Sequence, residues 1–143
     1  MYGQDRNQLR QMYLDVWRKH QGGELLQPLE ALIAEVIGMH PEYHSLLTAG
    51  TDALDKDFLP ELGESNPFLH MGMHIAIREQ LAPDRPSGIA TAHKKLLLRL
   101  QDPHQVEHQI MECLGHSLWQ AQQDNSAPDE SQYLRCVQQL AAS

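Results

Sequence analysis

The sequence has no long hydrophobic run. Among its 143 residues, no apolar stretch approaches the roughly 20 residues that a helix needs to cross a bilayer. The first residues, MYGQDRNQ, are polar, whereas a signal peptide starts with basic residues followed by an apolar stretch. We therefore expect a protein that neither spans a membrane nor carries a signal peptide.

Basic residues are also few. Lys and Arg total 11 against 19 Asp and Glu, so the formal charge at pH 7 is −8. A surface with this charge repels the phosphates of nucleic acids and the headgroups of anionic lipids. We expect no nucleic acid and no membrane as direct partners, which leaves a small molecule, dioxygen or an unidentified protein.

Cysteine occurs only twice. Cys113 and Cys136 form no CxxC motif. Two separate thiols in a chain without an export signal indicate reduced cysteines that pack as small apolar side chains in a cytoplasmic protein. The sequence also shows no Ser/His/Asp set or activated cysteine typical of a nucleophilic enzyme, and it leaves open whether the protein catalyses a reaction.

No segment alternates apolar and polar residues with the period of two that is typical of a strand. Apolar residues instead recur at intervals of three and four, and Gly–Gly, Asn–Pro and Asp–Pro pairs mark the segment ends. The pattern predicts an all-α protein, a single domain over residues 1–143 built as an antiparallel helical bundle of about four main helices with short extra helices. Residues 48–65 are expected to form a long irregular connection, a type of segment that often serves as a lid or functional connector. The expected helices lie at 4–21, 27–40, 41–47, 66–80, 89–100, 102–123 and 132–140.

Histidine is the residue that the sequence has in excess, with nine copies. Random placement of nine histidines in a chain of this length would give about half of one pair at the i,i+4 spacing that brings two side chains to one side of a helix. The sequence has three such pairs, which are His40/His44, His70/His74 and His104/His108.

Helical geometry places two of these pairs beside the expected core. At about 100° per residue, His70 and His74 fall within the apolar arc of their helix. His104, His108 and Glu112 form a stripe at the border of the aliphatic arc of theirs. A buried neutral imidazole needs partners for both ring nitrogens, and a buried carboxylate needs a cation or several donors. A metal ion meets both needs.

These residues predict a non-haem metal centre built from side chains on facing helices. The mixed imidazole and carboxylate set suits iron, as one or two ions, with zinc, nickel or manganese as alternatives. It holds too many ligands for one tetrahedral structural zinc, so a two-metal or open site fits better. The expected ligands are His70, His74, His108 and Glu112, with His104 and His44 as additions.

Four other residues also have an expected place. Glu107 falls in the aliphatic arc, either in a frayed first turn or as a second buried carboxylate. His40 precedes a proline, so we expect it at a helix end, where it need not share a face with His44. Trp17 and Trp119 are expected in the core.

Three stretches resemble a bacterial family of unknown function, DUF1841. They are PLEALIAEVIGMHPEYH, NPFLHMGMHIAIREQ and HQVEHQIMECLGHSLWQAQ, and the resemblance covers most of the chain. It implies no activity, because none is established for the family.

The spacing of the histidines also resembles two groups of metal-binding helical bundles. Hemerythrin-like proteins hold two irons with HxxxH and HxxxE pairs, to which His70/His74 and His108/Glu112 would correspond. The order along the chain differs, however, and no HxxxxD is evident near the C-terminus. DinB-like bundles bind one zinc or nickel ion with one histidine and an HxxxH pair, and His44 with either HxxxH pair could fill that role. Both are analogies of spacing and carry no activity with them.

Three functions follow from this pattern. The first is a cytoplasmic helical bundle with a His/Glu iron centre that handles dioxygen or redox chemistry. The second is a mononuclear zinc or nickel enzyme that acts through a metal-bound water or thiol. The third is a metal-free interaction module with hydrogen-bonded core histidines, whose acidic surface selects basic partners.

Overall fold

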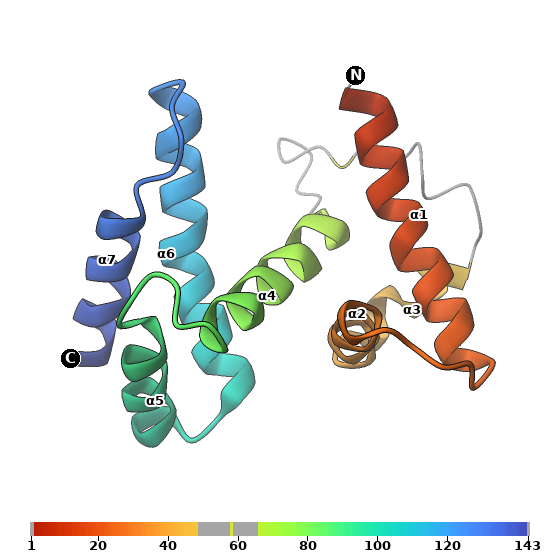
Figure 1. Cartoon of the computed structure of the whole chain (residues 1–143), viewed down its shortest axis with the longest axis horizontal. Coiled ribbons are helices and arrows are strands. Elements are labelled where there is room, and N and C mark those ends of the chain that lie inside the picture. The colour runs from red at the N-terminus through yellow and green to blue at the C-terminus, as the bar shows by residue number, and fades with distance from the viewer. Residues whose placement is uncertain (1, 49–57, 59–65, 143) are drawn as a thin grey trace. The chain divides into compact units, whose positions relative to one another are not determined.

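A computed structural model gives the fold and describes residues 2–48, 58 and 66–142, with side chains from residue 7 onward. The described residues form seven α-helices and one short 3-10 helix and contain no strand, which confirms the all-α prediction (Figure 1). Most of the expected connection at 48–65 lies outside the described residues. The helices are α1 (Tyr2–Gln21), α2 (Pro28–Gly38), η1 (Pro41–Tyr43), α3 (His44–Thr48), α4 (Pro67–Leu81), α5 (Ile89–Leu100), α6 (Pro103–Gln123) and α7 (Glu130–Ala142).

The chain divides into two compact units, Met1–Ile75 and Ala76–Ser143. The boundary falls inside α4, so this one helix contributes residues to both units. The single domain and the antiparallel order of the main helices stay predictions.

Helix ends in the first unit follow local sequence signals. α1 ends before Gly23, which has a φ of +71° that glycine adopts without steric cost. α2 begins at Pro28, whose missing N–H is no loss in a first turn. The Glu30 carboxylate accepts a hydrogen bond of 2.9 Å from the backbone N–H of Gln27 and so caps the N-terminus of α2.

Two further helices begin with an N-cap followed by proline, as the sequence predicts. Before α4, Oδ1 of Asn66 accepts the N–H groups two and three residues on, at 3.0 and 3.2 Å. Before α6, Oδ1 of Asp102 does the same at 3.0 and 3.3 Å. These bonds satisfy donors that the first turn of a helix leaves without intrahelical partners.

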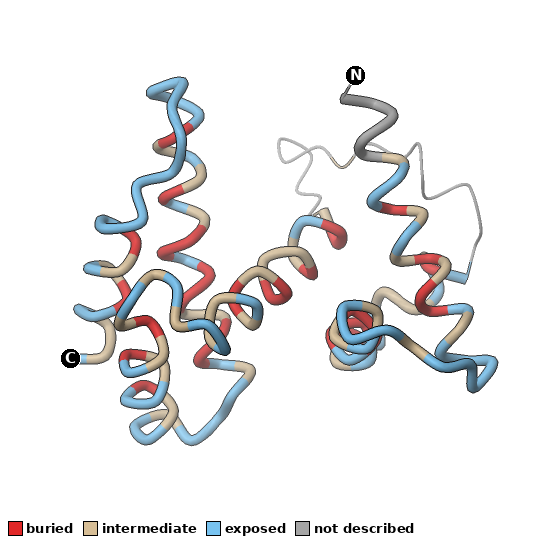
Figure 2. The backbone as a smooth tube through the Cα atoms, in the orientation of Figure 1, coloured by how far each residue is buried: buried red, intermediate tan, exposed pale blue. Residues whose placement is uncertain are grey.

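An apolar core fills the first unit. α1 packs against α2 and α3, and Figure 2 shows buried positions recurring along these helices. A charged side chain, Arg10, enters this interior with its guanidinium 4.8 Å from the ring centroid of Phe68, a cation–π geometry. Trp17 is buried here, as expected. The core consists of Leu14, Val16, Trp17, Ile33, Ala34, Val36, Ile37, Leu47, Phe68, Met71 and Ile75.

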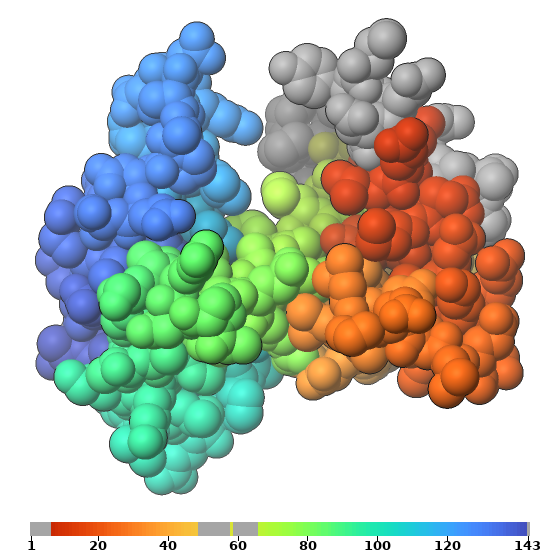
Figure 3. Space-filling view, viewed as in Figure 1, coloured from red at the N-terminus to blue at the C-terminus, as the bar shows by residue number. Residues whose placement is uncertain are grey.

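In the second unit, α5, α6 and α7 pack against one another. α7 runs back along α6 in Figure 1, and Figure 3 shows the atoms of α5 against those of α7. Trp119 is 54% exposed, so its expected place in the core is wrong, because it falls on the side of α6 opposite the buried Ser117 and Ala121. Buried apolar residues of this unit include Ile77, Ile89, Ala92, Leu96, Val106, Ile110, Met111, Leu114 and Val137.

The two cysteines are bonded to one another. Cys113 of α6 and Cys136 of α7 form a disulfide with their Cα atoms 5.8 Å apart. The prediction of reduced thiols is therefore wrong, because packing of α7 on α6 joins residues that are 23 positions apart. The cysteines no longer support a cytoplasmic location. Among the described helices, none has the length and hydrophobicity that crossing a membrane requires.

A buried ion pair also belongs to the second unit. Nε of Arg78 donates to Oε2 of Glu107 at 2.9 Å, and Nη2 donates to Oε1 at 3.4 Å. The Glu107 side chain is 6% exposed. The sequence left open whether Glu107 lies in a frayed first turn or is a buried carboxylate. In the structure it is buried, and the guanidinium of Arg78 neutralises its charge.

We expect loss of the disulfide to lower the free energy of unfolding by about 3 kcal/mol, because the bond closes a loop of moderate length in the unfolded chain. Urea unfolding of the oxidised and the reduced wild type would measure the difference. The double variant Cys113→Ala/Cys136→Ala is the control, since reductant should not change its midpoint. Equal midpoints for oxidised and reduced wild type would contradict the prediction.

We also expect Arg78→Met to destabilise the protein by about 3–5 kcal/mol, because it removes a cation that is hydrogen-bonded to the buried Glu107 carboxylate. The double variant Arg78→Met/Glu107→Leu should lose less, since it removes the buried carboxylate together with the cation. Chemical unfolding of both variants tests this. If the single variant loses less than about 1 kcal/mol of unfolding free energy, as expected for an exposed ion pair, the prediction is wrong.

Candidate metal centre

His40 lies at the end of α2 with its ring turned back along the helix. Its Nδ1 is 2.7 Å from the carbonyl oxygen of Val36, and the residue is only 2% exposed. A carbonyl oxygen accepts only, so Nδ1 carries the proton and Nε2 of the neutral ring carries a lone pair. Histidines that bind metals are commonly oriented by such a bond from the other ring nitrogen.

His70 and His74 lie one turn apart on α4. His74 is fully buried and His70 is half-buried, in agreement with their predicted place in the apolar arc. Their Nε2 atoms face each other at 3.3 Å. Two basic nitrogens at this distance need a proton or a cation between them, because two lone pairs would repel.

The rings of His40, His70 and His74 form a nearly equilateral triangle within the first unit. Their centroids are 5.0 Å apart for His40 and His70, and 4.9 Å apart for the other two pairs. Three imidazoles that bind one ion at about 2.1 Å with roughly tetrahedral angles place their centroids about 5 Å apart and their ligand nitrogens about 3.4 Å apart. The centroid spacing of the three rings is therefore compatible with a shared ion, and we call them the histidine triad.

Tyr43 flanks the histidine triad. Its ring stacks on His40 with a centroid distance of 5.4 Å and an interplanar angle of 8°. Burial, and to a lesser extent the nearby Glu42 carboxylate, raises the pKa of Tyr43. The phenol is thus neutral at physiological pH and adds no negative charge beside the triad.

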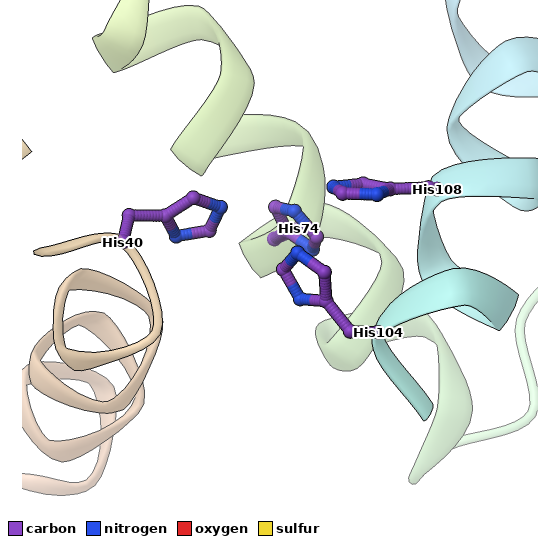
Figure 4. A group of neighbouring side chains, drawn as sticks. All are labelled: His40, His74, His104 and His108. Atoms are coloured by element: carbon purple, nitrogen blue, oxygen red, sulfur yellow. The ribbon is translucent and has the colours of Figure 1, made fainter. Parts of the chain in front are cut away.

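The second unit holds another histidine pair. His104 and His108 are half-buried on the first turns of α6, with ring centroids 4.1 Å apart. Figure 4 draws this pair together with His40 and His74 of the first unit. Within each of these two pairs, ring nitrogens suited to metal binding lie no more than 4.8 Å apart.

The other residues expected as ligands have different surroundings. Nε2 of His44 lies 2.9 Å from the carbonyl oxygen of Ile37, to which it donates, and its ring lies 4.4 Å from that of Trp17. Glu112 is exposed on α6. The assignment of His44 and Glu112 as ligands stays a prediction.

His40 is not among the ligands that the sequence predicts. α2 ends at Gly38, and Pro41 begins η1, so His40 lies between two helices and the i,i+4 spacing does not place it on one helix face with His44. The same break lets the His40 ring turn back to the Val36 carbonyl inside the core. A histidine directly after an apolar helix and before a proline was the available signal.

The model of one protein family matches residues 5–139. The chain belongs to the family described as a domain of unknown function, DUF1841. The match confirms the resemblance seen in the three sequence stretches. No curated protein and no solved structure matches the chain. The similarity of this DUF1841 member to hemerythrin-like and DinB-like bundles thus remains one of histidine spacing.

We expect His40 and His44 to be opposite tautomers in the metal-free protein, because their carbonyl partners face different nitrogens. His40 should carry its proton on Nδ1 and His44 on Nε2. Long-range proton–nitrogen correlation spectra of nitrogen-15-labelled protein distinguish the two forms. An Nε2-protonated His40 would remove the basis for its Nε2 as a ligand atom.

Proposed function

We propose that this protein binds a first-row transition-metal ion through the histidine triad of its first unit. The near-equal spacing of the rings of His40, His70 and His74 supports this proposal most directly. In each neutral ring one nitrogen can coordinate while the other keeps its proton. In His40 the nitrogen that keeps its proton is Nδ1, which donates a hydrogen bond to the carbonyl oxygen of Val36.

One ion per triad fits better than two bridged irons. Carboxylates bridge and balance the charge in di-iron bundles. Glu107 is paired with Arg78 and Glu112 is exposed, and both of these acids belong to the second unit. A set of imidazoles suits zinc, nickel, copper and iron, whereas manganese favours oxygen ligands.

Three protein ligands leave a coordination position open, as in catalytic rather than structural sites. A zinc or nickel ion there would activate a bound water, and an iron ion would support dioxygen or redox chemistry. His104 and His108 form a second group of imidazoles, and we propose that it too binds metal.

The alternative function is a metal-free interaction module. The 3.3 Å separation of the two Nε2 atoms of His70 and His74 also fits an N–H···N hydrogen bond. In that case the triad would serve only to satisfy buried polar groups. Metal content distinguishes the two functions.

We expect untagged protein, purified without chelators, to contain about one metal ion per histidine triad. Elemental analysis for Fe, Zn, Ni, Mn and Cu, with an absorption spectrum, identifies the ion. His74→Gln should weaken binding more than about 100-fold in competition with a chromogenic chelator, because a direct ligand costs more than an outer-shell partner. A helical circular-dichroism spectrum would show that the variant is folded.

His20→Gln is the matched control, since it changes an exposed histidine of the same unit and should leave binding unchanged. The double variant His104→Gln/His108→Gln reports on the second pair through the number of ions bound. Less than about a tenth of an ion per chain, with no uptake on titration, would exclude the metal proposal and favour the interaction module.

A further inference from the structure

A pocket of about 270 Å³ opens beside the disulfide of the second unit. Both Cys113 and Cys136 line it. Cys113 is 3% exposed, whereas Cys136 is half-buried, so a molecule in the pocket reaches the bond from the Cys136 side. Other residues of the lining include His116, Ser117, Tyr133 and Arg135.

The lining of this pocket contrasts with the charge of the chain. The protein has a formal charge of −8, yet none of the described residues that line the pocket is acidic. Arg135 brings a permanent positive charge. Tyr133 adds no negative charge, because burial raises its pKa to about 12. The pocket therefore favours an anion.

We propose that this pocket is a thiol–disulfide exchange site for anionic low-molecular-weight thiols, with Cys136 as the sulfur that is attacked. The volume lies near the lower end of small-molecule sites, which suits a compact thiol. Arg135 binds the carboxylate of that thiol. The proposal is independent of metal binding, because all its residues belong to the second unit and none is in the histidine triad.

The exchange balances without a further oxidant. The incoming thiolate attacks Sγ of Cys136 and forms a mixed disulfide, while the bond between Cys136 and Cys113 breaks. The electron pair of the broken bond stays on Sγ of Cys113, which then takes up a proton. Solvent supplies that proton. A second thiol attacks the mixed disulfide, which yields the Cys136 thiol and the oxidised dimer of the small thiol.

Exchange at this site opens the covalent link between α6 and α7. The pair Cys113–Cys136 joins the two helices across a sequence separation of 23. The reduced form keeps its noncovalent packing but loses the restriction on its unfolded chain. The site thus couples the state of the small-thiol pool to the stability of the second unit.

The test compares an anionic thiol, 3-mercaptopropionate, with a cationic one, 2-mercaptoethylamine, on the oxidised full-length protein. Rates are compared at equal thiolate concentration, and with allowance for thiol pKa, because thiolate fraction and nucleophilicity both affect the rate. We expect the preference for the anionic thiol to fall about fivefold in Arg135→Gln, the effect of removing one nearby charge that water screens. Lys94→Gln removes the same charge from an exposed position of α5 outside the pocket and should keep the wild-type preference.

Acid quenching and peptide mass spectrometry locate the mixed disulfide, which we expect on Cys136. An adduct on Cys113, or a preference that Arg135→Gln and Lys94→Gln change equally, would overturn the proposal. Free thiols in protein purified under air, or a bond that neither small thiol opens, would do the same. All these readouts use surface variants and the wild type, so none depends on a cysteine variant that fails to fold.

Discussion

The candidate site depends on the burial of imidazoles in the apolar core of the first unit. His40 and His74 are almost completely removed from solvent, so their ring nitrogens must find partners in the protein or in a bound ion. The Val36 carbonyl meets this need for one nitrogen of His40, and the facing rings of His70 and His74 meet it for another two. These partners are carried by helices, so the rings are held in place before any ion binds.

The second unit satisfies its buried polar groups in another way. Glu107 is neutralised by the guanidinium of Arg78 within hydrogen-bonding distance. A carboxylate engaged like this loses much of its value as a metal ligand, because its charge is already balanced. Of the two carboxylates of α6 considered from sequence, Glu107 is therefore already paired, whereas the role of the exposed Glu112 as a ligand stays a prediction.

Much of the helical structure follows from local signals. Proline after Asn66 and Asp102 marks two helix starts, and Gly23 marks a helix end, because capping and φ preferences act within a few residues. The burial of His74 also follows from its apolar neighbours one turn away. Residues at the border of an apolar arc are different. Glu112 lies on such a border by helical geometry and is exposed, since the width of the buried arc depends on how neighbouring helices pack.

The sequence by itself determined the all-α class, most helix ends and the presence of imidazoles on a buried helix face, because each rests on contacts between residues close in the chain. Only the tertiary structure decided that His40 joins His70 and His74, that Arg78 neutralises Glu107 and that the two cysteines meet. Each of these pairs joins residues at least 23 positions apart. No periodicity within one helix reports such distances, since they arise only when separate helices pack against one another.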